Sequence, residues 1–295
     1  MTEYIFGLVD VFAEEALGGN PLAVVEGADD LSDDLMRRIS GEFNQAETTF
    51  LMKSARADWK LRSFTAIGVE VGGAGHNALG AWLWLADRGL LGDLEAPKTF
   101  RQEIGGHVLP ITLSGKKGRF VGSMNQTALK LGPPITDLAP LAAALGLSRD
   151  DLLDGPSARA ANTGAAHLMV RARDRSAVDR AEPNAADLLQ VLGSAEAEGC
   201  YLYTIGEGKS EEAKVDRAYA RFFNPTIGLW EDSATGTAAG PLCAYLAVHD
   251  MLLDGRLIIE QGTRMNRPSF LDVRLSPDPV LSGSGLVVAR GTLHL

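Results

Sequence analysis

The sequence has few of the residues that build disulfide frameworks or metal sites. Its 295 residues include only two cysteines, Cys200 and Cys243. Two cysteines this far apart make neither a disulfide framework nor a zinc site, so we expect two buried thiols. No two histidines have the spacing of a helical metal motif such as HExxH, since they are scattered over His76, His107, His167, His249 and His294. The sequence therefore predicts no metal.

Excess positive charge and long apolar runs are also missing. Lys and Arg number 28 against 38 Asp and Glu, which gives a formal net charge of -10. A chain of this charge repels polyanions, which argues against nucleic acid and anionic membrane surfaces as partners. The longest apolar candidate, Ala78 to Leu85, is far too short to span a bilayer, and Met1–Tyr4 lacks the features of a signal peptide. We expect a cytoplasmic protein without membrane or nucleic-acid partners.

The chain does contain short strand-like segments that alternate with a few helical ones, and its length favours two domains. In the first half, Ser32 is placed as an N-cap and Gly89 as a helix stop. In this half we expect strands over 4–12, 22–25, 48–52 and 59–64, one helix that begins at Ser32 and a second over 76–88. In the second half we expect strands over 159–161, 168–171, 201–205 and 213–223, and helices over 137–145, 185–192 and about 234–250. The Gly132-Pro133-Pro134 segment marks the boundary, giving domains 1–130 and 131–295, with the last strand able to return to the first domain.

A weak internal repeat suggests that the two halves are related. The first half reads Arg62-Ser63-Phe64, Ile67-Gly68, Glu70 and Gly75, and the second reads Arg221-Phe222-Phe223, Ile227-Gly228, Glu231 and Gly236. The separation from glutamate to glycine is five positions in both copies. Both copies end at the start of a helix made of small residues.

These two helix starts are candidate anion sites. The first amides of a helix have no partner within the helix, and glycine lets a ligand approach them closely. Gly75-His76 and Gly236-Thr237 provide such starts and are suited to hold a carboxylate and to stabilise developing negative charge. The alternative is that both are tight helix starts whose small residues serve packing alone.

A different function is also compatible with the first of these turns. The run from Gly73 to Ala78 fits the GxGxxG/A dinucleotide fingerprint, with Asp93 and Glu95 near the distance of a ribose-binding acid. This interpretation predicts an NAD(P)-dependent oxidoreductase. It requires a parallel βαβ unit, whereas the preceding segments read as a series of strands with little helix between them.

Two acidic residues are candidates for the chemistry. Glu47 begins a β-branched, apolar strand, and burial in a cleft would raise its pKa toward the range useful for proton transfer. Asp232 lies just before the second helix start. As isolated observations, the simpler interpretations are favoured: an ordinary surface acid for Glu47 and a helix-start acid for Asp232.

Taken in order along the chain, the motifs resemble the PhzF-like (phenazine-biosynthesis-like) family. The matching segments are Gly18-Gly19-Asn20-Pro21-Leu22-Ala23-Val24-Val25, Glu47-Thr48-Thr49-Phe50, Gly75-His76 with Leu79-Gly80, Glu231-Asp232 through Leu242, and Gln261-Gly262 with Arg267-Pro268-Ser269. The resemblance implies an α/β (α+β) diaminopimelate-epimerase-like fold. Such a fold has two pseudo-symmetric domains, each a curved, mostly antiparallel sheet around a central helix. It also implies a homodimer that acts on a small anionic metabolite without metal or organic cofactor.

The resemblance further implies which residues act. Glu47 corresponds to the family's single acid–base glutamate in an interdomain site, supported by His76, Asp232 and Thr237. The substrate-binding set is Asn20, Gly75, Thr235 and Gly236, with the two glycines offering backbone amides. The fold's epimerases use two cysteines at positions that here look like Ala74 and Thr235, and neither of these can act as a thiolate. The implied chemistry is therefore that of an isomerase such as trans-2,3-dihydro-3-hydroxyanthranilate isomerase.

The sequence departs from the family pattern at three positions. Ala46 stands for the usual serine before the glutamate, Ser233 for the usual proline and Thr237 for the usual serine. These changes keep a hydroxyl at position 237 and leave the proton chemistry plausible. They also motivate an alternative, a non-catalytic metabolite-binding or interaction protein with the same fold.

Overall fold

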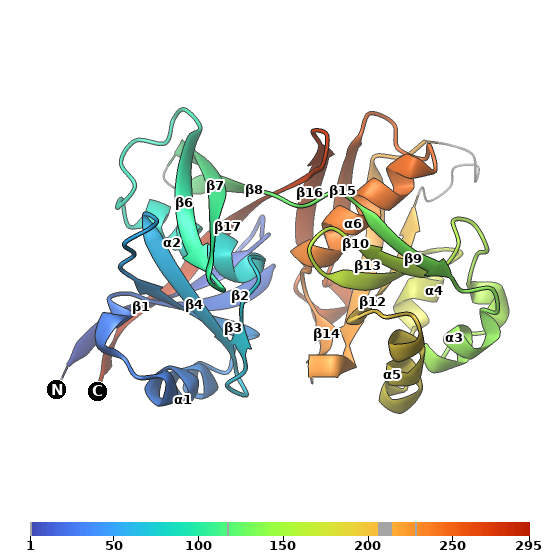
Figure 1. Cartoon of the computed structure of the whole chain (residues 1–295), viewed down its shortest axis with the longest axis horizontal. Coiled ribbons are helices and arrows are strands. Elements are labelled where there is room, and N and C mark those ends of the chain that lie inside the picture. The colour runs from blue at the N-terminus through green and yellow to red at the C-terminus, as the bar shows by residue number, and fades with distance from the viewer. Residues whose placement is uncertain (1, 117, 206–213, 228) are drawn as a thin grey trace. The chain divides into compact units, whose positions relative to one another are not determined.

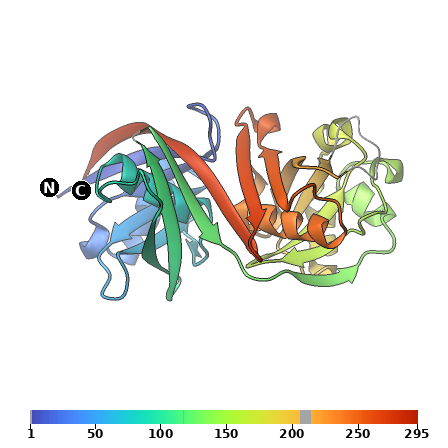
Figure 2. The same cartoon turned by 90° about the horizontal axis from the view of Figure 1, so that it is seen from above.

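The computed structural model describes residues 2–116, 118–205, 214–227 and 229–295. The chain divides into two compact units, one formed by Met1–Asn125 with Ser282–Leu295 and the other by Gln126–Leu281. The last strand pairs with the first from Glu3 opposite His294 onward, so both termini lie side by side in the first unit (Figure 1 and Figure 2).

Strands form most of the first unit. Its elements are β1 (Glu3–Val11), β2 (Asn20–Val25), η1 (Ala28–Asp30), α1 (Asp33–Phe43), β3 (Glu47–Met52), β4 (Trp59–Thr65), β5 (Glu70–Val71), α2 (His76–Asp87), β6 (Lys98–Ile104), β7 (His107–Lys116) and β8 (Arg119–Asn125), joined by most of β17 (Pro279–His294).

The second unit contains more short helices. Its elements are β9 (Lys130–Pro134), α3 (Ala139–Ala144), η2 (Arg149–Asp151), β10 (Arg159–Asn162), β11 (Ala166–Arg171), α4 (Arg175–Arg180), α5 (Ala185–Ser194), β12 (Gly199–Ile205), β13 (Arg217–Asn224), η3 (Pro225–Ile227), β14 (Leu229–Asp232), α6 (Gly236–Val248), β15 (Arg256–Gln261), η4 (Thr263–Met265) and β16 (Ser269–Leu275). The segment 130–134, where we expected the boundary, is β9 and pairs with β10 inside this unit.

The same order of strand pairings occurs in both units. In the first, β2 runs parallel to β3, β3 antiparallel to β4, β4 parallel to β6 and β6 antiparallel to β7. In the second, β11–β12, β12–β13, β13–β15 and β15–β16 repeat that order. The predicted fold class is therefore confirmed: two pseudo-symmetric α/β domains, each with a mostly antiparallel sheet.

One buried helix lies at the centre of each unit (Figure 1). Helix α2 contacts β1, β2, β3 and β8, and every residue from His76 to Ala86 is buried. Its sequence carries no charge before Asp87, as expected of a helix covered on all sides. Helix α6 contacts β10, β11, β15 and β16 in the same way. Close contact needs small residues: a Cβ on Gly80 would lie 2.6 Å from Leu22 Cδ2.

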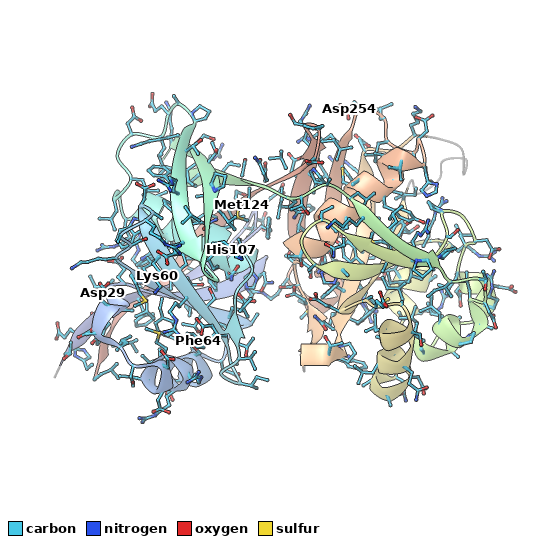
Figure 3. All side chains as sticks on the ribbon, viewed as in Figure 1. Asp29, Lys60, Phe64, His107, Met124 and Asp254 are labelled. Carbon is cyan, nitrogen blue, oxygen red and sulfur yellow. The ribbon has the colours of Figure 1, made fainter. Side chains whose placement is uncertain are left out.

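Helix α1 covers a second, smaller core of the first unit. Its predicted N-cap is confirmed, because Ser32 Oγ accepts a hydrogen bond from the Leu35 amide at 3.3 Å. Met36 and Ile39 of this helix pack with Phe64 of β4, which is labelled in Figure 3, and with Phe50 of β3. The two aromatic rings meet edge to face at 5.9 Å.

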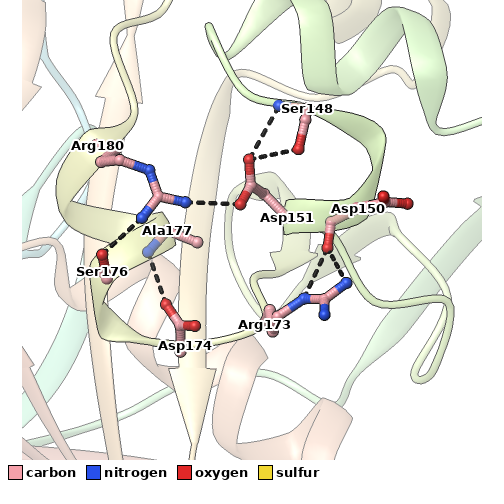
Figure 4. Close-up of polar contacts among 8 residues, drawn as sticks. All are labelled: Ser148, Asp150, Asp151, Arg173, Asp174, Ser176, Ala177 and Arg180. Carbon is pink, nitrogen blue, oxygen red and sulfur yellow. Dashed lines mark hydrogen bonds and ion pairs between the residues drawn. The ribbon is translucent and has the colours of Figure 1, made fainter.

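The sequence prediction missed the short helix α4, which Figure 4 shows with its contacts. Asp174 caps it by accepting from the Ala177 amide at 2.8 Å, and Arg180 donates to Asp151 at 2.6 Å. Only the adjacent residues Ala177 and Val178 of this helix are buried, so its sequence shows no apolar stripe at helical spacing. The predicted strand over 213–223 is found as β13 from Arg217, while its first residue, Ala213, lies outside the described residues.

The internal repeat corresponds to a repeated ion pair. Arg62 Nε and Nη2 donate to both oxygens of Glu70 at 2.7 and 2.8 Å, and Arg221 does the same with Glu231 at 2.9 and 2.8 Å. Each guanidinium also lies over a phenylalanine ring two residues further on. Gly228, part of the second copy, lies outside the described residues.

The two ion pairs differ in burial, which provides a matched stability test. The side chains of Arg221 and Glu231 are 9% and 10% exposed, against 19% and 42% for Arg62 and Glu70. Glu231→Gln leaves a buried guanidinium without its counter-charge, so we expect it to lower the free energy of unfolding by about 3 kcal/mol. Glu70→Gln is the control and should cost less than about 1 kcal/mol. Urea unfolding measures the free energy of unfolding of both variants. Equal losses would contradict the expectation that the more buried ion pair contributes more to stability.

Candidate functional site

The start of α2 is organised by one side chain, that of Asn77. Its Oδ1 accepts from the amides of Gly75 and Ala78 at 2.7 and 2.8 Å, and its Nδ2 donates to the Gly73 carbonyl at 3.0 Å. The amide of Gly75, which we expected to face the ligand, is therefore occupied within the protein. Among the described residues, the amides of His76 and Asn77 donate to no protein acceptor and are the free donors of this helix start.

The strands β2 and β3 bring two further predicted residues to this region. Glu47, half-buried, is the first residue of β3 and lies opposite Leu22 of β2, two positions after the buried Asn20. Thr49, on the same face as Glu47, donates to the Asn77 carbonyl at 3.3 Å. Because two strand residues span about 7 Å, Glu47 lies at the end of β3 where α2 begins. Asn20, Glu47 and His76 thus belong to one part of the first unit.

His76 is held neutral by its surroundings. The side chain is 8% exposed, and its Nε2 has no hydrogen-bond partner among the described residues. Burial lowers the pKa of His76 to about 4, because a charged imidazolium would lose its hydration. At neutral pH the uncharged ring can donate a hydrogen bond to a ligand through one nitrogen and accept one through the other.

In the second unit, Gln261 organises the start of α6. Its Oε1 accepts from the Thr235 amide at 3.2 Å and from the Tyr201 hydroxyl at 2.9 Å, while its Nε2 donates to the Asp232 carbonyl at 2.8 Å and to Thr235 Oγ1 at 3.0 Å. Thr235 Oγ1 in turn donates to Asp232 Oδ2 at 2.6 Å. The Thr235 hydroxyl, predicted to bind substrate, is therefore occupied in positioning the Asp232 carboxylate.

The first amides of α6 resemble those of α2. In the described part of the chain, the amides of Gly236 and Thr237 have no protein partner, whereas the Gly236 carbonyl accepts from Gln126 Nε2 at 2.9 Å. The expected donor Gly236 is therefore available. Gln126 packs against Gly240, where a Cβ would fall 1.7 Å from its Oε1.

The sequence analysis missed His167. This histidine lies near the start of β11, is 3% exposed, and its Nε2 is 3.0 Å from Thr237 Oγ1. Burial lowers the pKa of His167 to about 4. No sequence motif marks it, because its contact with Thr237 joins residues 70 positions apart.

Neither cysteine lies at a helix start. Cys200 is on β12 and Cys243 is within α6; both are buried and free. Burial raises the pKa of each thiol to about 12, so both remain protonated. Within the described residues, no group of three or more His, Cys, Asp and Glu side chains forms a candidate metal site.

The strand before the glycine-rich turn does not form a dinucleotide-binding unit. Strand β5 ends at Val71, just before the glycine-rich turn, and runs antiparallel to β4, whereas the fingerprint requires the first strand of a parallel βαβ unit. Asp93 accepts from the Glu95 amide at 2.9 Å, and Glu95 pairs with Lys116 at the surface. Of the described helices, none is long and apolar enough to cross a membrane.

The fold and these helix starts define a protein of the epimerase-fold class, and comparisons with known proteins support it. The family model described as "Phenazine biosynthesis-like protein" matches residues 9–291. A trans-2,3-dihydro-3-hydroxyanthranilate isomerase of Pseudomonas aeruginosa is 30% identical over 98% of each chain. A PhzF-family protein of Bacillus anthracis has a similar structure, with a TM-score of 0.85 at 25% identity over 100% of each chain.

A more distant structure has the same fold. A hydroxyproline epimerase of Agrobacterium vitis has a TM-score of 0.64 at 11% identity over 99% of this chain and 91% of that one. The chain belongs to the phenazine biosynthesis-like (PhzF) family, whose relatives are isomerases.

Removal of the Asn77 cap tests the organisation of the α2 start. Asn77→Leu leaves the amides of Gly75 and Ala78 buried without an acceptor, so we expect the free energy of unfolding to fall by about 2 kcal/mol. Asn77→Asp keeps both accepted bonds and should lose less. Urea unfolding compares the two variants, and a leucine variant as stable as the aspartate variant would contradict the capping role.

The two buried histidines predict a pH dependence of stability. Their pKa of about 4 in the folded state lies below the ordinary 6.5, so protons bind preferentially to the unfolded chain. The stabilisation from neutral rings is complete above about pH 6.5 and is lost as the pH falls toward 4. Between pH 7.5 and 4.5, the Tm of the wild type should fall more steeply than that of the His76→Gln/His167→Gln double variant. If the Tm of both proteins fell equally with pH, the lowered pKa values of His76 and His167 would be wrong.

Proposed function

We propose that this protein is a cofactor-independent isomerase that moves a proton within a small carboxylate-bearing metabolite. Membership in the phenazine biosynthesis-like family and the 30% identity to a trans-2,3-dihydro-3-hydroxyanthranilate isomerase support the reaction class. The free amides of His76 and Asn77 and of Gly236 and Thr237 support an anionic substrate.

Glu47 is the proposed acid and base. It would remove a proton from a carbon made acidic by a neighbouring unsaturated or carboxyl group and return it to another carbon. Asp232 and a neutral His76 would hold or relay protons on the substrate, and the helix amides would stabilise charge on its carboxylate. No step in this scheme requires a redox partner, because the proton leaves and re-enters the same molecule.

The observation that carries the single-glutamate mechanism is an asymmetry between the units. The repeated arginines align the two units, because Arg62 lies opposite Phe50 of β3 and Arg221 opposite Leu202 of β12. Three residues before these positions, β12 has Gly199 where β3 has Glu47. A Cβ on Gly199 would lie 2.4 Å from the Phe222 ring, so no side chain fits there. Together with Ala74, Thr235 and two protonated thiols, this leaves no symmetric second base for a two-base racemisation.

Replacement of the glutamate tests the proposal. Glu47→Gln is nearly isosteric but cannot cycle a proton, so we expect turnover of trans-2,3-dihydro-3-hydroxyanthranilate to fall at least about 100-fold. Glu42→Gln, on the exposed face of α1, is the matched control and should keep full activity. NMR in deuterated water follows product and carbon-bound deuterium together.

The outcomes separate the mechanism from the reaction class. Wild-type turnover in Glu47→Gln would refute the role of Glu47. Absence of both turnover and deuterium incorporation in the wild type would refute the isomerase on this substrate and favour the metabolite-binding alternative.

A further inference from the structure

We propose that His167 is a positioning residue that fixes the Thr237 hydroxyl as a hydrogen-bond donor, so that this part of the site accepts a carboxylate or carbonyl oxygen and not an N–H or O–H group. The inference rests on the proposed function in one respect: Thr237 is taken to contact the substrate. The geometry of the His167–Thr237 pair stands independently of it.

The imidazole of His167 is held rigidly. Strands on both sides fix the backbone of His167, because β11 pairs with β10 at Ala161 and with β12 at Gly199. Its ring meets Phe222 edge to face, with the ring centres 4.9 Å apart. The Nε2–Oγ1 distance of 3.0 Å to Thr237 is that of a good hydrogen bond. The ring therefore presents one nitrogen to one hydroxyl.

The ring is neutral, so only one of its nitrogens carries hydrogen. Burial at 3% exposure disfavours the imidazolium, and Nδ1 is buried with no hydrogen-bond partner among the described residues. A hydrogen on Nδ1 would create an orphaned buried N–H donor, which folded proteins avoid more strictly than an unused acceptor. The hydrogen therefore belongs on Nε2, and Nε2–H donates to Thr237 Oγ1.

This tautomer determines what Thr237 offers to a ligand. Because Oγ1 accepts from His167, its own hydrogen is free to point elsewhere, and the side chain is only half-buried. Beside it, the amides of Gly236 and Thr237 have no protein partner in the described residues. The start of α6 thus presents only donors, and an acceptor oxygen is the group that matches them.

The first unit has no equivalent of this pair. The position of His167 in β11 corresponds to Leu22 in β2, by their shared register opposite Gly199 and Glu47. Leu22 packs against the central helix at Gly80 and offers no polar group. A histidine at this position therefore serves a requirement of the second unit and not of the fold that both units share.

Nitrogen-15 NMR of the histidine rings tests the tautomer without any substrate. We expect His167 to show a hydrogen on Nε2, none on Nδ1, and no titration between pH 8 and 5. Thr237→Val removes the acceptor and should shift the Nε2–H resonance, while His249→Gln, an exposed histidine, should leave it unchanged. A hydrogen on Nδ1 would overturn the proposal whatever the protein catalyses.

Kinetics with trans-2,3-dihydro-3-hydroxyanthranilate test the functional part. We expect His167→Leu to lower kcat/KM about 10- to 100-fold, and His167→Gln, whose side-chain amide can donate in place of Nε2–H, to recover most of that loss. If His167 acts through Thr237, His167→Leu should have no further effect in the Thr237→Val background. Circular dichroism confirms that each variant is folded.

Each kinetic outcome bears on one proposal. Full activity in a folded His167→Leu variant would overturn the positioning role. So would a His167→Leu/Thr237→Val double variant whose loss of kcat/KM is the product of the two single losses. Either result would leave Glu47 as the acid–base group. Inactivity of the wild type on this substrate would count against the proposed function, and the NMR result would still decide the tautomer.

Discussion

The candidate chemistry depends on backbone amides at the starts of two buried helices. A helix has unpaired amides at its start, and burying them without partners is costly. In each unit one side-chain amide, of Asn77 or of Gln261, accepts from the N-cap residue and leaves the next two amides available. One side chain thus fixes each helix start, and the amides left without a protein partner are those that a ligand can use.

The two units reach this result with different residues. Asn77 is inside the helix whose start it organises, whereas Gln261 reaches across from β15. The register places Ile104 of β6 where β15 has Gln261, so the first unit lacks a polar side chain at that position. Thr49 and Tyr201, at equivalent positions of β3 and β12, make the strand contacts to Asn77 and Gln261. The same backbone constraint is met by unrelated side chains.

Much of this could be predicted from the sequence. The helix cap at Ser32, the uninterrupted apolar helix after His76 and the repeat around Arg62 and Arg221 depend on local patterns that propensity and spacing reveal. The occupied amide of Gly75 could have been suspected, since Asn77 stands where a side chain can cap the preceding turn. His167 and Gln261 could not be assigned, because their contacts depend on strand pairings between segments far apart in sequence. The helix α4 was missed because it buries only two adjacent residues, which leave no apolar stripe in the sequence.

The asymmetry of the two units has one steric origin, the ring of Phe222. This ring fills the space where a side chain on Gly199 would lie, so the second unit cannot carry a counterpart of Glu47. The same ring packs edge to face against His167 and so holds the imidazole toward Thr237. In the first unit, Ser63 occupies the equivalent position of β4, and its small side chain bonds to Thr49. Exchange of a serine-sized for an aromatic residue at this position therefore both excludes a second glutamate and supports a neutral histidine. Both units keep free helix amides, but only the first carries the proposed base and only the second carries the His167–Thr237 pair.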